Sequence, residues 1–113
     1  MSEAPPADLY DRLLNSSRRH ERRGKTLPYT SANGHMYSFL TADGRVCLRL
    51  SATDRLVFRE RHGGDDVVQH GRVMKEYVEI PADLLTDPDV MLPLFDAALD
   101  YVMSLRPKPT RRA

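Results

Sequence analysis

The fold is decided by the stretch His35-Met36-Tyr37-Ser38-Phe39-Leu40-Thr41-Ala42-Asp43-Gly44-Arg45-Val46-Cys47-Leu48-Arg49-Leu50. Its first six residues are rich in aromatic side chains. In its last six residues, every second side chain is apolar. An alternation with a period of two is typical of a strand that buries one face, and Asp43-Gly44 is a dipeptide that favours a tight hairpin. The stretch therefore predicts two antiparallel strands with one core face and one more polar face.

Further strands are predicted on both sides of this hairpin. Residues 26–31 are extended in character, and Pro28 cannot donate a ladder hydrogen bond, so this strand should lie at an edge or be irregular. Asn33-Gly34 predicts a second tight hairpin, which would make the first three strands a meander. Residues 76–80 alternate again and predict a fourth strand. Residues 67–68 are compatible with a short strand or with a loop.

Helices are predicted near both ends and in the middle of the chain. From Asp8 to about Arg19, the apolar residues recur at the spacing of one helical face, and Gly24 reads as a stop signal. Ser51 is a plausible N-cap for a helix that ends at Gly63-Gly64. Residues 82–85 predict a single helical turn.

The strongest helical signal lies between Asp89 and Leu105. Its apolar residues trace a broad stripe along one side of a helix, and Asp87 or Asp89 could cap it. Pro93 fits if the regular helix begins close to it and otherwise causes a kink. Pro107 should end the helix.

Together these elements predict an α+β fold, in which an antiparallel β-sheet (a meander of about four strands) packs against N-terminal and C-terminal helices. The length of 113 residues indicates one domain. We expect a disordered N-terminal tail over residues 1–7, the single domain over residues 8–106 and a basic C-terminal tail over residues 107–113.

Charge is distributed unevenly along the chain. Residues 1–25 carry six bases and four acids, residues 26–105 carry seven bases and twelve acids, and residues 106–113 carry four bases and no acid. The acidic middle should repel nucleic acid, so any attraction to phosphate would come from the basic ends. Solubilising tails are the more common role of such termini.

Composition places the chain in the cytoplasm. Cys47 is its only cysteine, which excludes an internal disulfide and fits a reducing compartment. No run of apolar residues is long enough to span a membrane. Residues 1–6 lack the apolar core of a secretory signal, so we expect none.

No constellation of residues predicts catalysis, a metal site or a cofactor. The four histidines lack the close pairing of metal ligands, and Cys47 lies on a strand, where a small packing role is usual. One weak candidate for anion or partner contact remains: Arg49, Lys75 and Tyr77 could lie together on the polar face of the sheet. The alternative is an amphipathic face whose polar side chains pair with Glu79 or with solvent and bind no ligand.

The order of several phrases is similar to that of a known family. They are Asn33-Gly34-His35-Met36-Tyr37, the stretch from Asp43 to Leu50, Met74-Lys75-Glu76-Tyr77-Val78-Glu79-Ile80-Pro81, Leu84-Leu85-Thr86-Asp87-Pro88 and the ending from Ala98 to Pro109. The region from about Gly24 to Pro109 resembles the TfoX N-terminal domain family, in its short single-domain members, and more distantly the YjbR/MmcQ group. The resemblance implies helices packed on an antiparallel sheet and a link to regulators of bacterial competence.

The sequence thus predicts a small, non-enzymatic interaction module that binds an unknown protein partner, as a monomer or a homodimer. The alternative is a nucleic-acid-binding domain that uses its basic termini, with weak, non-specific binding at most. An enzyme that uses Cys47 or a carboxylate has no motif in its support. No membrane association is expected.

Overall fold

The computed structural model describes residues 5–64, 66–69 and 71–108 and has the α+β architecture that the sequence predicts. Five antiparallel strands form one sheet in the order β1-β2-β3-β5-β4. The strands are β1 (Tyr29–Ala32), β2 (His35–Leu40), β3 (Val46–Arg49), β4 (Asp66–Gln69) and β5 (Arg72–Ile80). The helical elements are α1 (Pro6–Asn15), α2 (Ala52–His62), the 3-10 turn η1 (Ala82–Thr86) and α3 (Pro88–Ser104).

The predicted strands are confirmed, and one strand is added. β1 lies at the edge of the sheet and begins at Tyr29, directly after Pro28. β4, at the position where the sequence allowed a strand or a loop, pairs with β5 and forms the opposite edge. The sheet therefore has five strands instead of about four, because β5 extends back to Arg72 and supplies a partner for β4.

Both tight turns occur where the sequence places them. Asn33 and Gly34 have φ of 56° and 79°, as a turn between adjacent strands requires. A side chain at position 34 is also excluded by space, since a Cβ there would lie 1.6 Å from the carbonyl oxygen of Lys108. In the second turn, the Gly44 N–H donates to the carbonyl of Thr41 over 3.0 Å.

The first helix differs most from expectation. α1 begins at Pro6, where the ring fits a first helical position, two residues before the predicted helix start at Asp8. It ends at Asn15, not near Arg19, because the Ser16 hydroxyl donates to the carbonyl of Leu13 and the backbone then leaves the helix. Residues 16–28 form an irregular segment, here called the strap. The rest of the predicted N-terminal tail lies outside the described residues.

The other helices follow the prediction closely. Ser51 caps α2, since its hydroxyl accepts the Asp54 N–H, and α2 ends before Gly63. α3 begins and ends one residue before the predicted range of Asp89 to Leu105 and contains Pro93 inside the helix. Asp87 is at the N-cap position but makes no side-chain cap hydrogen bond. At the C-terminus, the Lys108 N–H donates to the carbonyl of Asn33, which ties the start of the predicted basic tail to the β1–β2 turn. Residues 109–113 of that tail lie outside the described residues.

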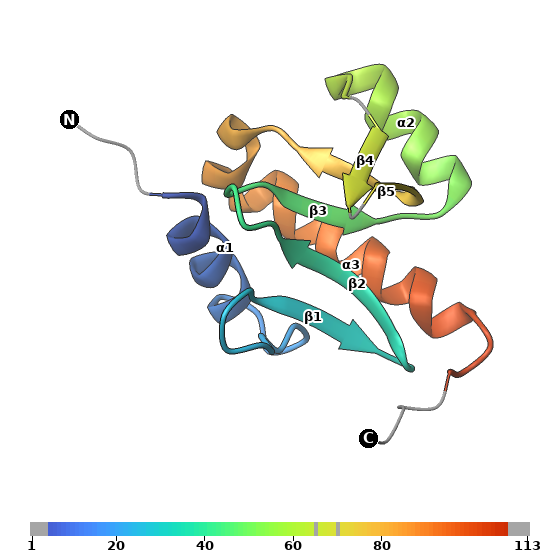
Figure 1. Ribbon diagram of the computed structural model, residues 1–113, viewed down its shortest axis with the longest axis horizontal. Helices are drawn as coiled ribbons and strands as arrows, with labels where there is room; N and C mark the ends of the chain where they lie inside the picture. The colour runs from blue at the N-terminus through green and yellow to red at the C-terminus, as the bar shows by residue number, and fades with distance from the viewer. Residues whose placement is uncertain (1–4, 65, 70, 109–113) are drawn as a thin grey trace.

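The main core lies between the sheet and the helices α1 and α3. In Figure 1, α3 passes behind the sheet and α1 lies to its left. Its sheet face carries the alternating apolar residues of β3 and β5, as predicted, and its helix face is centred on Phe95. In α2, by contrast, only Phe58 is buried. Leu56 lies on the outside of α2 and is 62% exposed.

The opposite face of the sheet, here called the outer face, is less polar than expected. Phe39, Cys47, Val67 and Tyr77 form a second buried cluster on it. The β4–β5 hairpin projects in front of the sheet in Figure 1 and places Val67 over this cluster. The prediction of a more polar face is therefore wrong at Cys47. Part of this face is covered by β4, for which the sequence allowed either a strand or a loop.

Candidate functional site

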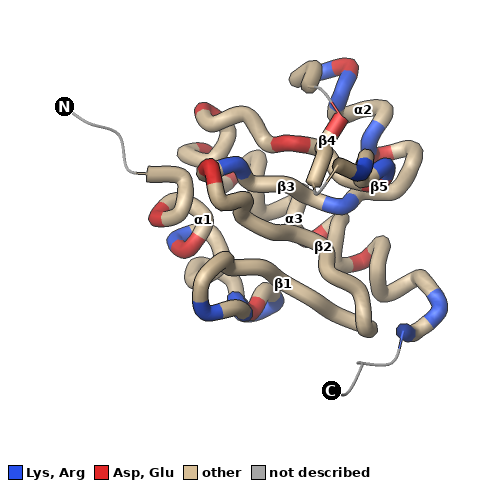
Figure 2. Tube along the Cα trace, viewed as in Figure 1, with Lys and Arg blue, Asp and Glu red and all other residues tan. Residues whose placement is uncertain are grey.

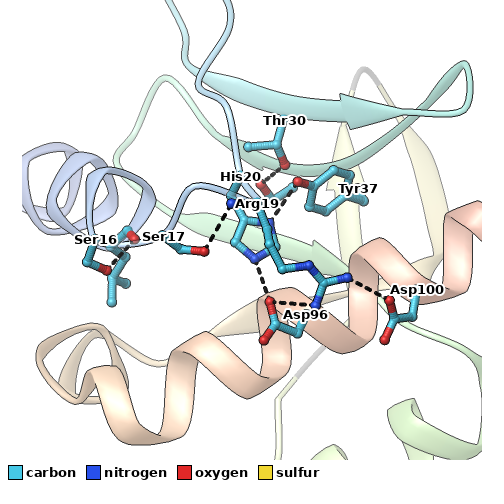
Figure 3. A network of polar contacts seen from close by, with 10 residues as sticks. Ser16, Ser17, Arg19, His20, Thr30, Tyr37, Asp96 and Asp100 are labelled. Carbon is cyan, nitrogen blue, oxygen red and sulfur yellow. Dashed lines mark hydrogen bonds and ion pairs between the residues drawn. The ribbon is translucent and has the colours of Figure 1, made fainter.

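A network of polar side chains, with His20 and Tyr37 buried at its centre, fastens the strap to the core (Figure 3). His20 is 3% exposed and uses both ring nitrogens: Nδ1 lies 2.8 Å from the Tyr37 hydroxyl and Nε2 lies 2.9 Å from Asp96 Oδ1. Arg19, beside it, forms ion pairs with Asp96 at 3.2 Å and with Asp100 at 2.9 Å. The strap is thus held against α3 at two successive residues.

A β-bulge positions Tyr37 for this network. Thr30 pairs with Ser38 and Ser31 pairs with Met36, so Tyr37 is an extra residue in β2. The extra residue turns Tyr37 and Ser38 toward the same side of the sheet. Ser38 there bonds the Tyr10 hydroxyl at 2.6 Å and also Thr30. Burial raises the pKa of Tyr10, so its hydroxyl stays protonated.

The sequence did not reveal this network. His20 belongs to a charged run that reads as solvated, and its partner Tyr37 is inverted by a bulge that leaves no clear mark in the sequence.

Tyr37, His20 and Asp96 repeat the order of a hydroxyl, an imidazole and a carboxylate known from hydrolases. Tyr37 is only 1% exposed, so a substrate cannot reach its oxygen, and the arrangement acts as an anchor.

The predicted candidates Arg49, Lys75 and Tyr77 have different environments. Arg49 is directly opposite Tyr77 in the β3–β5 register, as the prediction requires. Its Nε donates to Glu76 Oε1 over 2.7 Å, so an anion would have to compete with this glutamate. The Tyr77 hydroxyl donates to the carbonyl of Met36 over 2.7 Å, and burial raises the pKa of Tyr77 to about 12. Lys75 is exposed.

Glu76 is the centre of this second cluster and was not singled out from the sequence. Tyr101 of α3 donates its hydroxyl to the Glu76 carboxylate, which also accepts from Arg49. Partial burial by itself raises the pKa of Glu76, but the hydrogen bonds from Tyr101 and Arg49 outweigh it and lower the pKa below its usual value. The cluster therefore favours an ionised Glu76 that joins β5, β3 and α3.

Cys47 is poorly placed for nucleophilic chemistry. It is buried on the outer face, and burial raises the pKa of its thiol to about 12. A thiol with such a pKa is almost wholly protonated at neutral pH and a weak nucleophile.

Over residues 5–64, 66–69 and 71–108, no three metal-binding side chains come together in a group. No helix in the described part of the chain is long and apolar enough to cross a membrane.

An apolar hollow opens on the outer face of the sheet. It holds about 240 Å³ and lies between the end of the strap, the strands β1 and β2 and the tip of the β4–β5 hairpin. We call it the outer groove, defined by its lining: Leu27, Pro28, Tyr29, Met36, Phe39, Leu40, Thr41, Gln69 and Met74. The polar groups among these side chains are the Tyr29 and Thr41 hydroxyls and the Gln69 amide. The groove is thus suited to apolar groups.

A larger hollow of about 350 Å³ lies between α2 and α3. Four of the side chains that line it are ionisable: Asp54, Arg61, His62 and Asp89. Covering these groups with a partner would remove them from water, which costs free energy unless each finds a partner. The outer groove is lined by no acidic residue, lysine, arginine or histidine, so this cost is smaller there and the groove is the better candidate for an interaction site.

Comparison of the chain with protein-family models, with curated proteins and with solved structures found no match.

Proposed function

We propose that this protein is a small, non-enzymatic interaction module that binds a protein partner through the outer groove. One observation carries the proposal: the side of the sheet that α1 and α3 do not cover has an apolar hollow beside Leu27, which is 44% exposed. Closing such a hollow with a partner side chain removes apolar surface from water, at about 25 cal/mol for each Å². The methionines at positions 36 and 74 can adapt to different side chains.

The proposal places the module in the cytoplasm, which the single reduced Cys47 supports. A regulatory role is proposed from the resemblance to the TfoX N-terminal domain family. That part is an analogy, since related folds serve many functions.

Nucleic-acid binding is the second candidate function, because the strap exposes several basic side chains. Arg18, Arg23 and Lys25 are exposed, and no ion pair to them occurs within the described residues. Phosphate contacts by such side chains supply affinity without sequence specificity.

The test compares two methionine variants. Met36→Lys places a charge in the outer groove, whereas Met103→Lys places the same charge at an exposed position of α3. Immobilised wild-type protein and both variants are incubated with extract of the native cell, and retained proteins are identified by mass spectrometry and then titrated as purified proteins. We expect one partner to bind wild type and Met103→Lys but to bind Met36→Lys at least tenfold more weakly. A partner that binds all three equally would refute the groove, provided that melting temperatures show each variant to be folded.

A further inference from the structure

The outer groove is bordered by basic residues on two sides. Arg23 forms an isolated antiparallel bridge with Tyr29, with N···O distances of 2.7 and 2.9 Å. At the far side, Arg72 is the register partner of Gln69. Directly opposed residues of an antiparallel pair have their side chains on the same face. Because Tyr29 and Gln69 line the groove, Arg23 and Arg72 lie on its face as well.

Three acids of the sheet and its turns already have basic partners, whereas Glu21 of the strap is exposed and forms no ion pair within the described residues. Arg45 forms ion pairs with Asp43 at 3.1 Å and with Glu79 at 3.1 Å. Asp66 of β4 is paired with Arg59 of α2 at 3.3 Å. Within the described residues, neither Arg23 nor Arg72 forms an ion pair.

Figure 2 agrees with this distribution: blue segments occur on the strap below β1 and near the tip of the β4–β5 hairpin. Among the described residues, the two arginines that border the groove therefore have no acidic partner, and they attract an anionic partner.

The size of the groove selects the kind of partner. A volume of about 240 Å³ is below the roughly 300–1,000 Å³ of typical small-molecule sites. It suits one or two apolar side chains of a peptide. Extended or irregular peptide segments present such side chains together with their flanking charges.

Bases of a nucleic acid fit this face less well. Single-stranded nucleic acids stack their bases on open aromatic rings. Phe39 and Tyr77 are packed edge to face, with ring centroids 5.3 Å apart, and both are buried. Tyr29 alone remains partly open, so the outer face lacks the successive stacking platforms that a base-binding sheet needs.

We propose that the outer groove binds an acidic peptide segment, which inserts an apolar side chain between Tyr29 and Met74 and places its carboxylates beside Arg23 and Arg72. This inference rests on the proposed function and adds the chemistry of the partner. The two parts of the site act differently: the apolar lining supplies affinity, and the basic border selects the sign of the partner's charge.

The test uses three short fluorescein-labelled peptides in anisotropy titrations. The first has a central leucine flanked by glutamates, the second replaces the glutamates with lysines, and the third replaces the leucine with serine. We expect the first peptide to bind at least tenfold more tightly than either of the others, and its binding to weaken as salt is raised. Equal or tighter binding of the lysine peptide would overturn the inference.

Charge-reversal variants locate the binding. Arg23→Glu and Arg72→Glu should each weaken the glutamate peptide by about two- to fivefold, as expected for exposed ion pairs. Arg12→Glu is the matched control, since Arg12 is an exposed residue of α1 and lies off the outer face; it should leave the affinity unchanged. Equal losses in all three variants would mean that only net charge matters and would refute the site.

Two further outcomes separate this inference from the proposed function. If a cellular partner depends on Met36 but none of the peptides binds, the interaction module stands and the acidic-peptide inference fails. If single-stranded DNA displaces the glutamate peptide and binds more tightly than it, the inference fails and the nucleic-acid function takes its place.

Discussion

The side chain of Asn33 donates a hydrogen bond to the backbone carbonyl of Val102, with an Nδ2···O distance of 2.9 Å. The same amide nitrogen lies 2.9 Å from the carbonyl of Leu105. A residue of the β1–β2 turn thus donates to two carbonyls at the C-terminal end of α3, where helical partners run out. The Val102 carbonyl also accepts the Leu105 N–H over 3.2 Å. The relationship joins two elements that are distant in the sequence and helps to fix how α3 lies across the sheet.

The first prediction tests this cap. Asn33→Gly keeps the positive φ of 56° that the turn requires but removes both donated hydrogen bonds. We expect a loss of about 1–3 kcal/mol of unfolding free energy in urea, since two partly buried carbonyls lose a partner. A loss below about 0.5 kcal/mol, the range of ordinary surface substitutions, would show that water replaces the side chain without cost.

The second prediction concerns the core. Phe95 is 0% exposed and packs against Tyr10 and His20, with ring centroids 6.1 and 5.5 Å apart. Phe95→Ala should cost roughly 3–5 kcal/mol through lost transfer free energy and the cavity left behind. Met103→Ala, at an exposed position of the same helix, serves as the control and should cost under about 0.5 kcal/mol. Urea unfolding of both variants measures the difference, and similar losses would contradict the assignment of Phe95 to the core.

The third prediction concerns the strap. His20 is the only buried residue between Asn15 and Leu27, so His20→Ala should release the segment and leave the Tyr37 hydroxyl without its partner. The strap contains exposed arginines and a lysine, which makes trypsin a direct probe of its release. Cleavage within residues 18–25 should become at least tenfold faster. His62→Ala, at an exposed position of α2, is the control. If the strap of this variant were cleaved faster to the same extent, the whole domain would have loosened.

The fourth prediction is a pH dependence at Glu76. Its pKa is lowered in the folded chain, so it contributes stability that is present above its ordinary pKa of 4.5 and is lost as the pH falls through the lower folded value. Urea unfolding of wild type should therefore show stability decreasing below about pH 4.5, and Glu76→Gln should show a smaller decrease over that window. Tyr101→Phe removes one of the hydrogen bonds that lower the pKa, so the decrease should be smaller than in wild type and should end at a higher pH. Identical pH profiles in all three proteins would show that Glu76 does not contribute to the loss of stability at low pH.

The fold could be predicted from local patterns, whereas the candidate site could not. Alternation in β3 and β5, the Asn33-Gly34 turn and the apolar stripe of α3 each depend on residues close in the sequence. The outer groove depends on how far the β4–β5 hairpin bends over the sheet, which brings Met74 near Tyr29. His20 similarly takes its role from a bulge at Tyr37 and from Asp96 on another element. These contacts join residues that are far apart in the sequence. The local patterns of β4, which are weak, and of the charged run around His20 therefore do not predict them.

The last prediction separates the two candidate functions. If the basic ends are solubilising, duplex DNA should bind non-specifically, with a dissociation constant no tighter than roughly 10⁻⁴–10⁻⁶ M at physiological salt. Removal of residues 109–113 takes away Arg111 and Arg112 and leaves the Lys108–Asn33 hydrogen bond in place. This truncation should weaken DNA binding further while the melting temperature stays the same.

Fluorescence anisotropy at two salt concentrations, with an unrelated duplex as the comparison, measures these affinities. Met36→Lys adds a positive charge to the outer groove, so it should strengthen non-specific DNA binding slightly while it weakens binding of the protein partner at least tenfold. These opposite responses in one variant are expected only if the groove binds apolar peptide side chains. Tight, sequence-dependent DNA binding that survives the truncation would refute the interaction module, because the residues that carry it would then lie in the folded domain itself.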